Sequence, residues 1–302
     1  MKGKVKLSNR IIALIVAGAF VATIGFTLLG FFIAYWVSDK KAIIWHPDYE
    51  MLSEDELREC FDNNDYDTLF KQTGLTKAGI ERAKNDINGW ARVKSIQHSY
   101  FLKRSVAAVE YMPLICTDFI DGESASMIYL QRGDILVTSS THFSGFRIGH
   151  SAIVTDGEGG IVFQSNQVGE LNGYDTASAM FAVRTNFMVL RIKPEYFSDN
   201  GVEDQSYYNN LDRATEYIET NFAKVPYRAV TGVFTKKDSM RSTSCAHLIW
   251  YGFKHFDDER GGRFNLDLDS NGRLLVMPKD IAESPYVELV QNFGFNPDKM
   301  YE

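Results

Sequence analysis

GDILVTSSTHFSGFRIGHSAIVTDGEGGIVFQ, residues 133–164, alternates short apolar runs with turn residues. The runs ILV, AIV and IVF are rich in β-branched side chains and are bounded by Gly, Asp and Ser. Such runs are typical of strands, because branched side chains fit a pleated surface and turn residues allow the chain to reverse. The short connections between them predict an antiparallel sheet.

The strand pattern continues in FAVRT at 181–185 and FMVLRIKP at 187–194. Two helical patterns follow. One extends from Gln205 to Phe222, and the other begins near Thr243 and contains CAHLIWYGFKHF. The predicted fold class is therefore α+β, with an antiparallel sheet and a cysteine-bearing helix.

Upstream of the strands, residues 43–112 show a helical pattern and no recognisable chemistry. The segment 53–56, Ser-Glu-Asp-Glu, has the signature of a capping box, and Thr76 can cap a helix that runs to Ile87. An amphipathic helical stretch is expected from Trp90 to Tyr111. We interpret 43–112 as a helical connector that holds the remaining domain away from a membrane.

The membrane is suggested by an apolar stretch from Ile11 to Val37 that contains no charged residue. About 20 apolar residues suffice to span the hydrocarbon core, so this stretch is predicted to be a transmembrane anchor. A cleaved secretory signal is the alternative, but its apolar region has roughly 7–15 residues and ends at small residues. Here the stretch ends in bulky residues at 33–36, which favours the anchor.

The charges flanking this stretch predict its orientation. Four basic residues precede it and two follow it: Lys2, Lys4, Lys6, Arg10, Lys40 and Lys41. The positive-inside bias therefore makes residues 1–10 a cytoplasmic tail of a single-pass protein of the cell membrane and places the residues after the apolar stretch outside the cytoplasm. Tyr35 and Trp36 lie where an interfacial aromatic belt is expected.

Composition excludes several classes of protein. The 302 residues are 45% hydrophobic and 24% charged, which is typical of a globular chain. The net charge of −7 comes without a long basic run, so nucleic acid is not an expected partner. The three cysteines, Cys60, Cys116 and Cys245, form no CxxC pair, so no zinc site or disulfide framework is expected. One disulfide bond between Cys60 and Cys116 remains an alternative.

One segment near the C-terminus resembles a calcium-binding loop. The segment DLDSNG at 267–272 matches the start of a calcium loop, but Pro278 occupies the twelfth position, where a bidentate glutamate is required. We therefore reject the EF-hand interpretation in favour of an ordinary Asp/Asn/Gly turn. No metal and no cofactor are expected.

Cys245 is the candidate nucleophile. It follows the run 241–244, Arg-Ser-Thr-Ser, which is rich in N-cap residues, and precedes an apolar helical pattern, so the sulfur is expected in the first helical turn. Unpaired amides and the helix dipole favour a thiolate there and lower the cysteine pKa into the reactive range. The alternative is a small buried core residue, which is the more frequent fate of a lone cysteine.

His150 is the best-placed base among the six histidines. It opens the strand 150–154, His-Ser-Ala-Ile-Val, and a strand holds an imidazole ring rigidly. Gln164, the polar residue of the next strand, is expected to orient the imidazole as the third member of a triad does. A satisfied surface histidine and a solvent-facing glutamine are the alternatives.

The other histidines fit a catalytic role less well. His247 lies about 200° around the helix axis from Cys245 and is expected to point elsewhere. His255 is expected to stabilise the carboxyl end of the same helix. His142 lies near the same strands and stays open as a substrate-side or loop residue.

These segments together resemble a known family. In chain order, GDILV, GHSAIV, a polar position in the next strand, TSCAHLIWYGF and DLDSNGRLLVMPKDIAESP are similar to the circularly permuted papain-like amidohydrolases, the YiiX and YaeF-like branch of the NlpC superfamily. In ordinary papain-like enzymes the cysteine helix precedes the histidine strand, whereas the permuted branch and this chain have the reverse order. The resemblance covers roughly residues 131–290.

The resemblance implies a permuted papain-like hydrolase domain at 113–302, with Cys245 as nucleophile, His150 as base and Gln164 as the orienting residue. Relatives often have a glutamate at the third position. A neutral amide fixes a tautomer but stabilises a developing imidazolium less than a carboxylate does, so slower turnover or a contribution from Glu170 is expected.

The leading hypothesis is a membrane-anchored cysteine hydrolase that cleaves an amide through an acyl-enzyme, with cell-wall peptides as one substrate class. The alternatives are a lipid esterase or acyltransferase of the same fold and a non-catalytic, membrane-tethered binding protein. Peptide amides or lipid-derived molecules and the membrane are therefore the expected partners.

Overall fold

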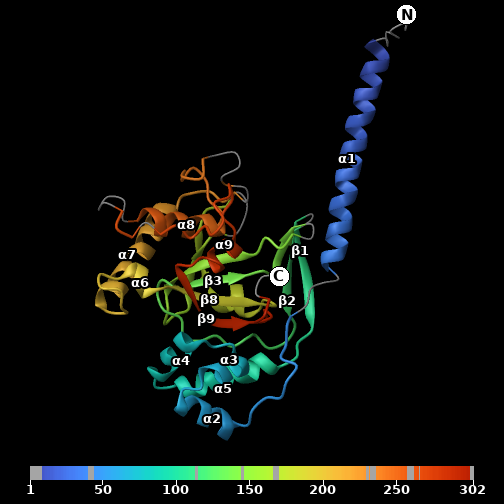
Figure 1. Cartoon of the computed structure of the whole chain (residues 1–302). Coiled ribbons are helices and arrows are strands. Elements are labelled where there is room, and N and C mark those ends of the chain that lie inside the picture. Colours follow the sequence, from blue (N-terminus) through green and yellow to red (C-terminus); the bar gives the residue numbers. More distant parts are fainter. Residues whose placement is uncertain are drawn as a thin grey trace, which may run out of the picture.

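A computed structural model describes residues 9–39, 44–112, 115–143, 146–165, 170–228, 231, 236–256, 262–264 and 266–299. Helix α1 (Asn9–Asp39) extends away from a body that contains two antiparallel sheets and helices on both sides of the larger sheet (Figure 1). The predicted α+β class and the antiparallel sheet are confirmed.

The main sheet has the strand order β7-β6-β5-β3-β8-β9, and every neighbouring pair is antiparallel. Its strands are β3 (Ile135–Thr138), β5 (His150–Asp156), β6 (Ile161–Gln164), β7 (Gly173–Thr176), β8 (Phe187–Ile192) and β9 (Val287–Phe293). The strand predicted at 181–185 is wrong. Its first two residues are the end of the short π-helix η1 (Ser178–Ala182), and the residues that follow form a turn. Apolar side chains from η1 are nevertheless buried, which explains the apolar run.

A smaller sheet has the order β1-β2-β4, with β1 (Val106–Met112), β2 (Ile115–Ile120) and β4 (Thr141–Phe143). The helix predicted from Trp90 to Tyr111 is therefore too long, since α5 ends at Phe101. Val106 and Val109 have helical spacing, but they pair with β2 residues across an antiparallel ladder. Tertiary pairing overrides the local periodicity here.

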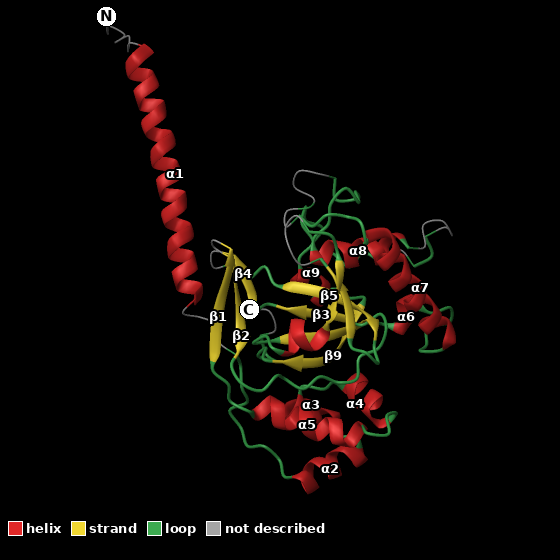
Figure 2. Cartoon of the chain, turned by 180° about the vertical axis from the view of Figure 1, so that it is seen from behind, coloured by secondary structure: helices red, strands yellow, loops and turns green. Residues whose placement is uncertain are grey.

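Helices cover both faces of the main sheet (Figures 1 and 2). One layer contains α6 (Pro194–Phe197), α7 (Gln205–Phe222), α8 (Cys245–His255) and α9 (Pro278–Ala282). The other contains α2 (Glu54–Asn63), α3 (Tyr66–Thr73), α4 (Lys77–Lys84) and α5 (Gly89–Phe101). The predicted bounds of α7 are confirmed.

The N-terminal helices share one core with the sheet. Leu57 of α2 and Ile80 of α4 are fully buried in the same cluster as Leu136 of β3 and Val189 of β8. Residues 54–101 are therefore a layer of the same fold and not a separate connector. Apolar burial on this scale is the main favourable contribution to folding.

The helix caps explain where two of these helices begin. Ser53 and Glu56 form the predicted capping box, in which the Glu56 carboxylate accepts from the Ser53 amide at 2.9 Å. Thr76 precedes α4 but makes no side-chain cap, because its hydroxyl donates to the Leu289 carbonyl of β9. Thr76 therefore attaches the helical layer to the sheet, and α4 ends at Lys84 before the predicted limit.

Buried charges join the same layers. Asp134, directly before β3, accepts from Arg82 of α4 at 2.7 Å and from Arg191 of β8 at 2.7 Å. All three side chains are buried. Two guanidinium groups lower the pKa of the Asp134 carboxyl, although its burial opposes this effect, so the group stays ionised.

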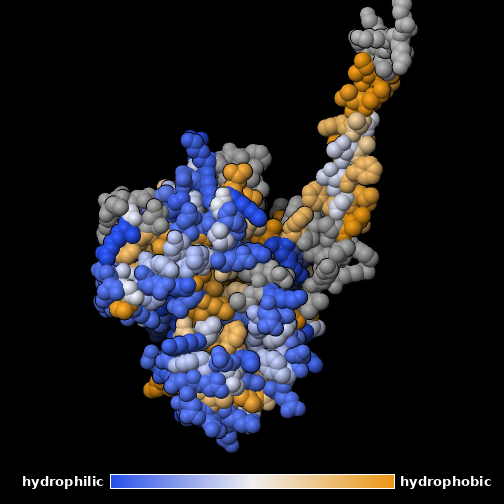
Figure 3. Space-filling view, in the orientation of Figure 1, coloured by the Kyte–Doolittle hydropathy of each residue, from blue (hydrophilic) through white to orange (hydrophobic). Residues whose placement is uncertain are grey.

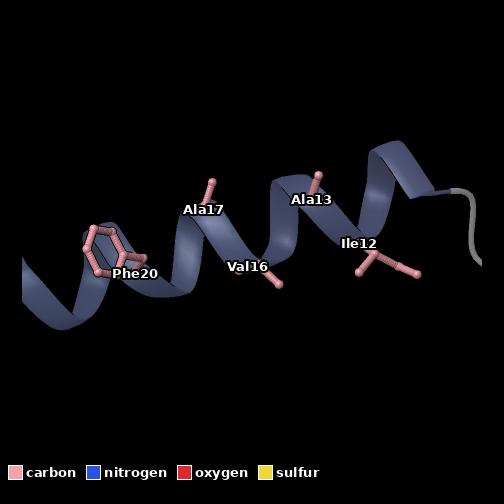
Figure 4. Close-up of a pocket in the computed structure, with 5 residues that line it drawn as sticks. All are labelled: Ile12, Ala13, Val16, Ala17 and Phe20. Atoms are coloured by element: carbon pink, nitrogen blue, oxygen red, sulfur yellow. The ribbon is translucent and has the colours of Figure 1, made fainter.

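Helix α1 contains a segment, Arg10–Ile33, that is long and apolar enough to cross a membrane, although a signal sequence passes the same test. Its apolar side chains are exposed (Figure 3), and five of them line a shallow apolar hollow along the helix (Figure 4): Ile12, Ala13, Val16, Ala17 and Phe20. The flanking basic residues Lys2, Lys4, Lys6, Lys40 and Lys41 lie outside the described residues, as do the side chains of Tyr35 and Trp36.

We expect Asp134→Ala to lower the free energy of unfolding by about 3–5 kcal/mol, because it leaves two buried guanidinium groups without their carboxylate. Denaturant titration of the full-length protein in detergent measures this loss. The control is Arg58→Ala, which removes an exposed pair with Asp62 at 3.0 Å and should cost less than about 0.5 kcal/mol. Equal losses for both variants would contradict the proposed role of Asp134.

Candidate active site

Cys245 is the first residue of α8, as predicted. The N-cap residue Ser244 has extended backbone angles, and its hydroxyl accepts from the His247 amide at 3.4 Å. The cysteine side chain is buried. It therefore lies at the positive end of the helix dipole but away from solvent.

Burial raises the pKa of the Cys245 thiol, whereas the backbone amides of Ser151, Ala246 and Cys245 itself oppose this rise. The expectation that the helix terminus produces a thiolate is therefore wrong for the resting protein. Desolvation of the charged form outweighs the hydrogen bonds that stabilise it. These same contacts place the sulfur against Ser151 of β5, the residue that follows His150.

His150 and Gln164 form the predicted pair. The His150 Nε2 atom lies 2.6 Å from the Gln164 Oε1 atom, and both side chains are buried. The imidazole also stacks on Phe181 of η1, with ring centroids 5.9 Å apart and an interplanar angle of 23°. Because an amide oxygen only accepts, this contact assigns the proton to Nε2 and leaves Nδ1 as the acceptor.

The pKa of His150 is lowered to about 4, chiefly by burial and also by the nearby Arg184 charge, while the Gln164 contact acts in the opposite direction. The imidazole is therefore neutral at pH 7. A neutral imidazole is the form that can accept a proton, so His150 is in the protonation state that a general base requires.

Gly149 fixes the backbone just before His150. It has φ +67°, and a Cβ atom there would lie 2.5 Å from the Thr138 carbonyl oxygen. Glycine satisfies both requirements, the left-handed conformation and the close approach of β3. The chain can therefore enter β5 with His150 paired opposite Thr138.

The pleat of β5 separates the side chains. Ala152 packs in the core of α2–α5, whereas Ile153 packs in the core of α7 and α8. Because alternate residues face opposite sides, His150 lies on the face of Ala152 and Ser151 on the face of α8. The structure thus brings His150 and Gln164 together and places Cys245 beside the next residue. No hydrogen bond joins the thiol and the imidazole within the part of the chain that is described.

Tyr227 is a residue of this site that the sequence did not indicate. Burial raises the pKa of its phenol, and the charge of a Cys245 thiolate acts in the same direction. The Tyr227 amide donates to the Glu170 carbonyl at 3.0 Å, and the Tyr227 backbone forms an isolated parallel β-bridge with Thr243. Tyr227 comes from a loop without periodicity, so no pattern in the sequence could identify it.

Three of the other histidines have structural partners. Both nitrogens of His247 are engaged, with the Thr243 hydroxyl at 3.0 Å and the Lys237 carbonyl at 2.8 Å, so it is not a base for Cys245. His142 contacts Asp118 at 3.1 Å. His255, in the last turn of α8, contacts an exposed carboxylate on the preceding loop.

All three cysteines are free thiols on different elements, so the Cys60–Cys116 disulfide is not formed. Among the described residues, no group of three or more His, Cys, Asp or Glu side chains is arranged to hold a metal ion. Comparisons with protein-family models, with curated proteins and with solved structures found no match. The functional argument therefore depends on the geometry of the site.

We expect alkylation of Cys245 by iodoacetamide to be slow at pH 7 and to increase about tenfold per pH unit, because the thiolate fraction grows in that proportion below a raised pKa. Peptide mass spectrometry of the full-length protein resolves the rate at each cysteine. Fast, pH-independent labelling between pH 6 and 8 would instead indicate a thiolate–imidazolium pair and contradict the neutral resting state.

We expect the free energy of unfolding to decrease as the pH falls from about 6.5 towards 4. In this range an unfolded His150 binds a proton that the folded one, with its pKa of about 4, does not, so acid favours unfolding by up to about 3 kcal/mol. His247, whose pKa burial also lowers to about 4, acts in the same direction. Denaturant titrations at pH 7.5, 5.5 and 4.5 measure the slope.

His150→Gln should remove part of this pH dependence and leave the part due to His247. The control is His98→Gln, because His98 is an exposed residue of α5. An unchanged slope in His150→Gln would show that His150 titrates alike in the folded and unfolded chains.

Proposed function

We propose that this chain is a membrane-anchored cysteine hydrolase with Cys245 as nucleophile and His150 as general base. One observation carries the proposal: the Cys245 sulfur lies against Ser151, while Gln164 engages Nε2 of the adjacent His150 and leaves Nδ1 as a proton acceptor. A nucleophile, a base and a residue that orients the base are the elements of a triad.

The resting charges determine the order of steps. Thiol and imidazole are both neutral, so the Cys245 proton moves to His150 Nδ1 as the sulfur attacks the substrate carbonyl carbon. In the resting structure the two side chains lie on opposite faces of β5, so this transfer requires the start of α8 to move towards His150 when substrate binds. Gln164 Oε1 keeps the Nε2 proton in place during the transfer.

The oxyanion and the leaving group are then stabilised by nearby donors. The amides of Cys245 and Ala246 at the start of α8 face the sulfur and can donate to the oxyanion. His150 returns its proton to the leaving amine as the tetrahedral intermediate collapses to a thioester. Water activated by His150 hydrolyses this acyl-enzyme and restores the thiol.

We propose a peptide amide as the substrate, with cell-wall peptides as the class that an extracytoplasmic domain would meet. The proposal places residues 1–10 in the cytoplasm and α1 in the membrane, supported by the length and apolar character of α1 and by the flanking charges.

A lipid ester is the second candidate, and exposed apolar side chains near the site favour it. Phe146, on the loop before β5, is 64% exposed, and Leu171, which bridges Pro226 beside Tyr227, is 61% exposed. Leu274 is 67% exposed on the segment leading to α9, whose first residue contacts Gly149. Apolar side chains around a membrane-tethered site suit an acyl chain.

Cys245→Ala should abolish hydrolysis without lowering the free energy of unfolding by more than about 1–2 kcal/mol, because it removes the nucleophile but only one buried sulfur. The measurement is turnover of a panel of wall peptides and phospholipids by the full-length protein in detergent. The matched control is Cys60→Ala, which should retain activity. Activity that survives in Cys245→Ala would exclude the mechanism, and binding without turnover by the unmodified protein would favour a non-catalytic role.

A further inference from the structure

The loop between α8 and α9 has the ligand spacing of a calcium loop over its first seven positions. Asp267, Asp269 and Asn271 occupy the first, third and fifth positions, Gly272 the sixth and Arg273 the seventh. Gly272 has φ +63°, which matches the sharp turn that a glycine provides there.

Backbone amides inside the loop fold it as such loops fold. The Asp269 amide donates to the Asp267 carboxylate at 3.2 Å, and the Asn271 amide donates to the Asp269 carboxylate at 3.4 Å. The Arg273 amide donates to the Asn271 side-chain oxygen at 2.9 Å. These turns direct the third-position carboxylate and the seventh-position carbonyl towards the same side.

A cation already occupies that side. The Lys237 ammonium donates to the second oxygen of the Asp269 carboxylate and, at 3.1 Å, to the Arg273 carbonyl oxygen. These two oxygens belong to the third and seventh ligand positions of a calcium loop. A lysine ammonium is a compact point charge with three donors, so it can satisfy oxygens that would otherwise bind a metal.

We propose that Lys237 is the built-in cation of a calcium-type loop, so that the ammonium replaces the metal and the loop takes no divalent ion while Lys237 is present. Removal of the ammonium converts the loop into a site for a hard divalent or trivalent cation with oxygen ligands. This inference does not depend on the proposed hydrolase activity.

Lys237 also contacts the first turn of α8 through its backbone carbonyl. The Lys237 carbonyl accepts from His247 Nε2 at 2.8 Å, and the other nitrogen of His247 contacts Thr243 at 3.0 Å. Lys237 therefore links the loop at 267–273 to the first turn of α8. Loss of the cation should loosen this turn, and a bound metal should tighten it again.

Trp250 provides a direct readout. Its indole N–H donates to the Asp267 carboxylate at 2.6 Å, and the Lys237 ammonium lies 4.6 Å from its ring centroid. A lanthanide ion at the position of the ammonium would therefore lie close enough to be excited through this indole. Lys254 is a matched control, since it lies 4.7 Å from the same ring and 3.5 Å from the Asp267 carboxylate but does not contact Asp269.

The test is terbium luminescence of the full-length protein in a non-ionic detergent, with excitation of tryptophan. Lys237→Met should give saturable emission that calcium displaces, whereas the unmodified protein and Lys254→Met should give none. Calcium should also raise the melting temperature of Lys237→Met by several degrees and leave the other two unchanged. The double variant Lys237→Met with Asp269→Asn should lose the emission.

Saturable, calcium-sensitive emission from the unmodified protein would overturn the proposal, because the loop would then bind metal beside the lysine. A folded Lys237→Met without emission would overturn it as well. If Lys237→Met does not fold, reductive methylation of the unmodified protein decides: Lys237 should react more than tenfold slower than the exposed Lys236. Equal rates would contradict the engaged ammonium.

Discussion

The contact of Asp134 with two guanidinium groups joins the N-terminal helical layer to two strands of the main sheet. Arg82 comes from the N-terminal helices and Arg191 from β8, while Asp134 itself leads into β3, the strand that pairs with β5. An ionised carboxylate without these partners would be costly to bury. Because β3 fixes the register of β5, the position of His150 depends on this cluster although none of its members lies in the site.

Burial also determines the chemistry of the site. It raises the pKa of the Cys245 thiol and lowers that of His150, so both groups rest in their neutral forms. A glutamine is then a suitable third residue, because Gln164 can orient a neutral ring without the desolvation cost of a buried carboxylate. The missing carboxylate and the neutral resting pair are therefore consistent with the proposed mechanism, in which charge would develop only during proton transfer.

The sequence predicted those features that depend on local pattern. The strands around His150 and Gln164, the helix that begins at Cys245 and α7 follow from periodicity and caps. The sequence-based predictions were wrong where contacts with distant residues determine the local structure. The β1 segment has helical spacing but pairs with β2, and η1 has the apolar pattern of a strand because its side chains are buried. Tyr227 and the raised pKa of Cys245 could not be predicted, since both result from tertiary burial.

The two halves of the site are held by different means. His150 belongs to a central strand whose ladder leaves it little freedom, whereas the start of α8 is held by loop contacts. The Thr243 amide donates to the Pro226 carbonyl at 3.1 Å, and the Thr243 carbonyl accepts from the Arg228 amide at 2.7 Å. Loops open locally at lower free-energy cost than central strands. The pleat of β5 places the imidazole and the thiol on opposite faces of the sheet in the resting structure. The proposed proton transfer therefore requires these loops to carry the start of α8 to the end of β5, where His150 is the first residue, while the ladder keeps His150 and Gln164 in place.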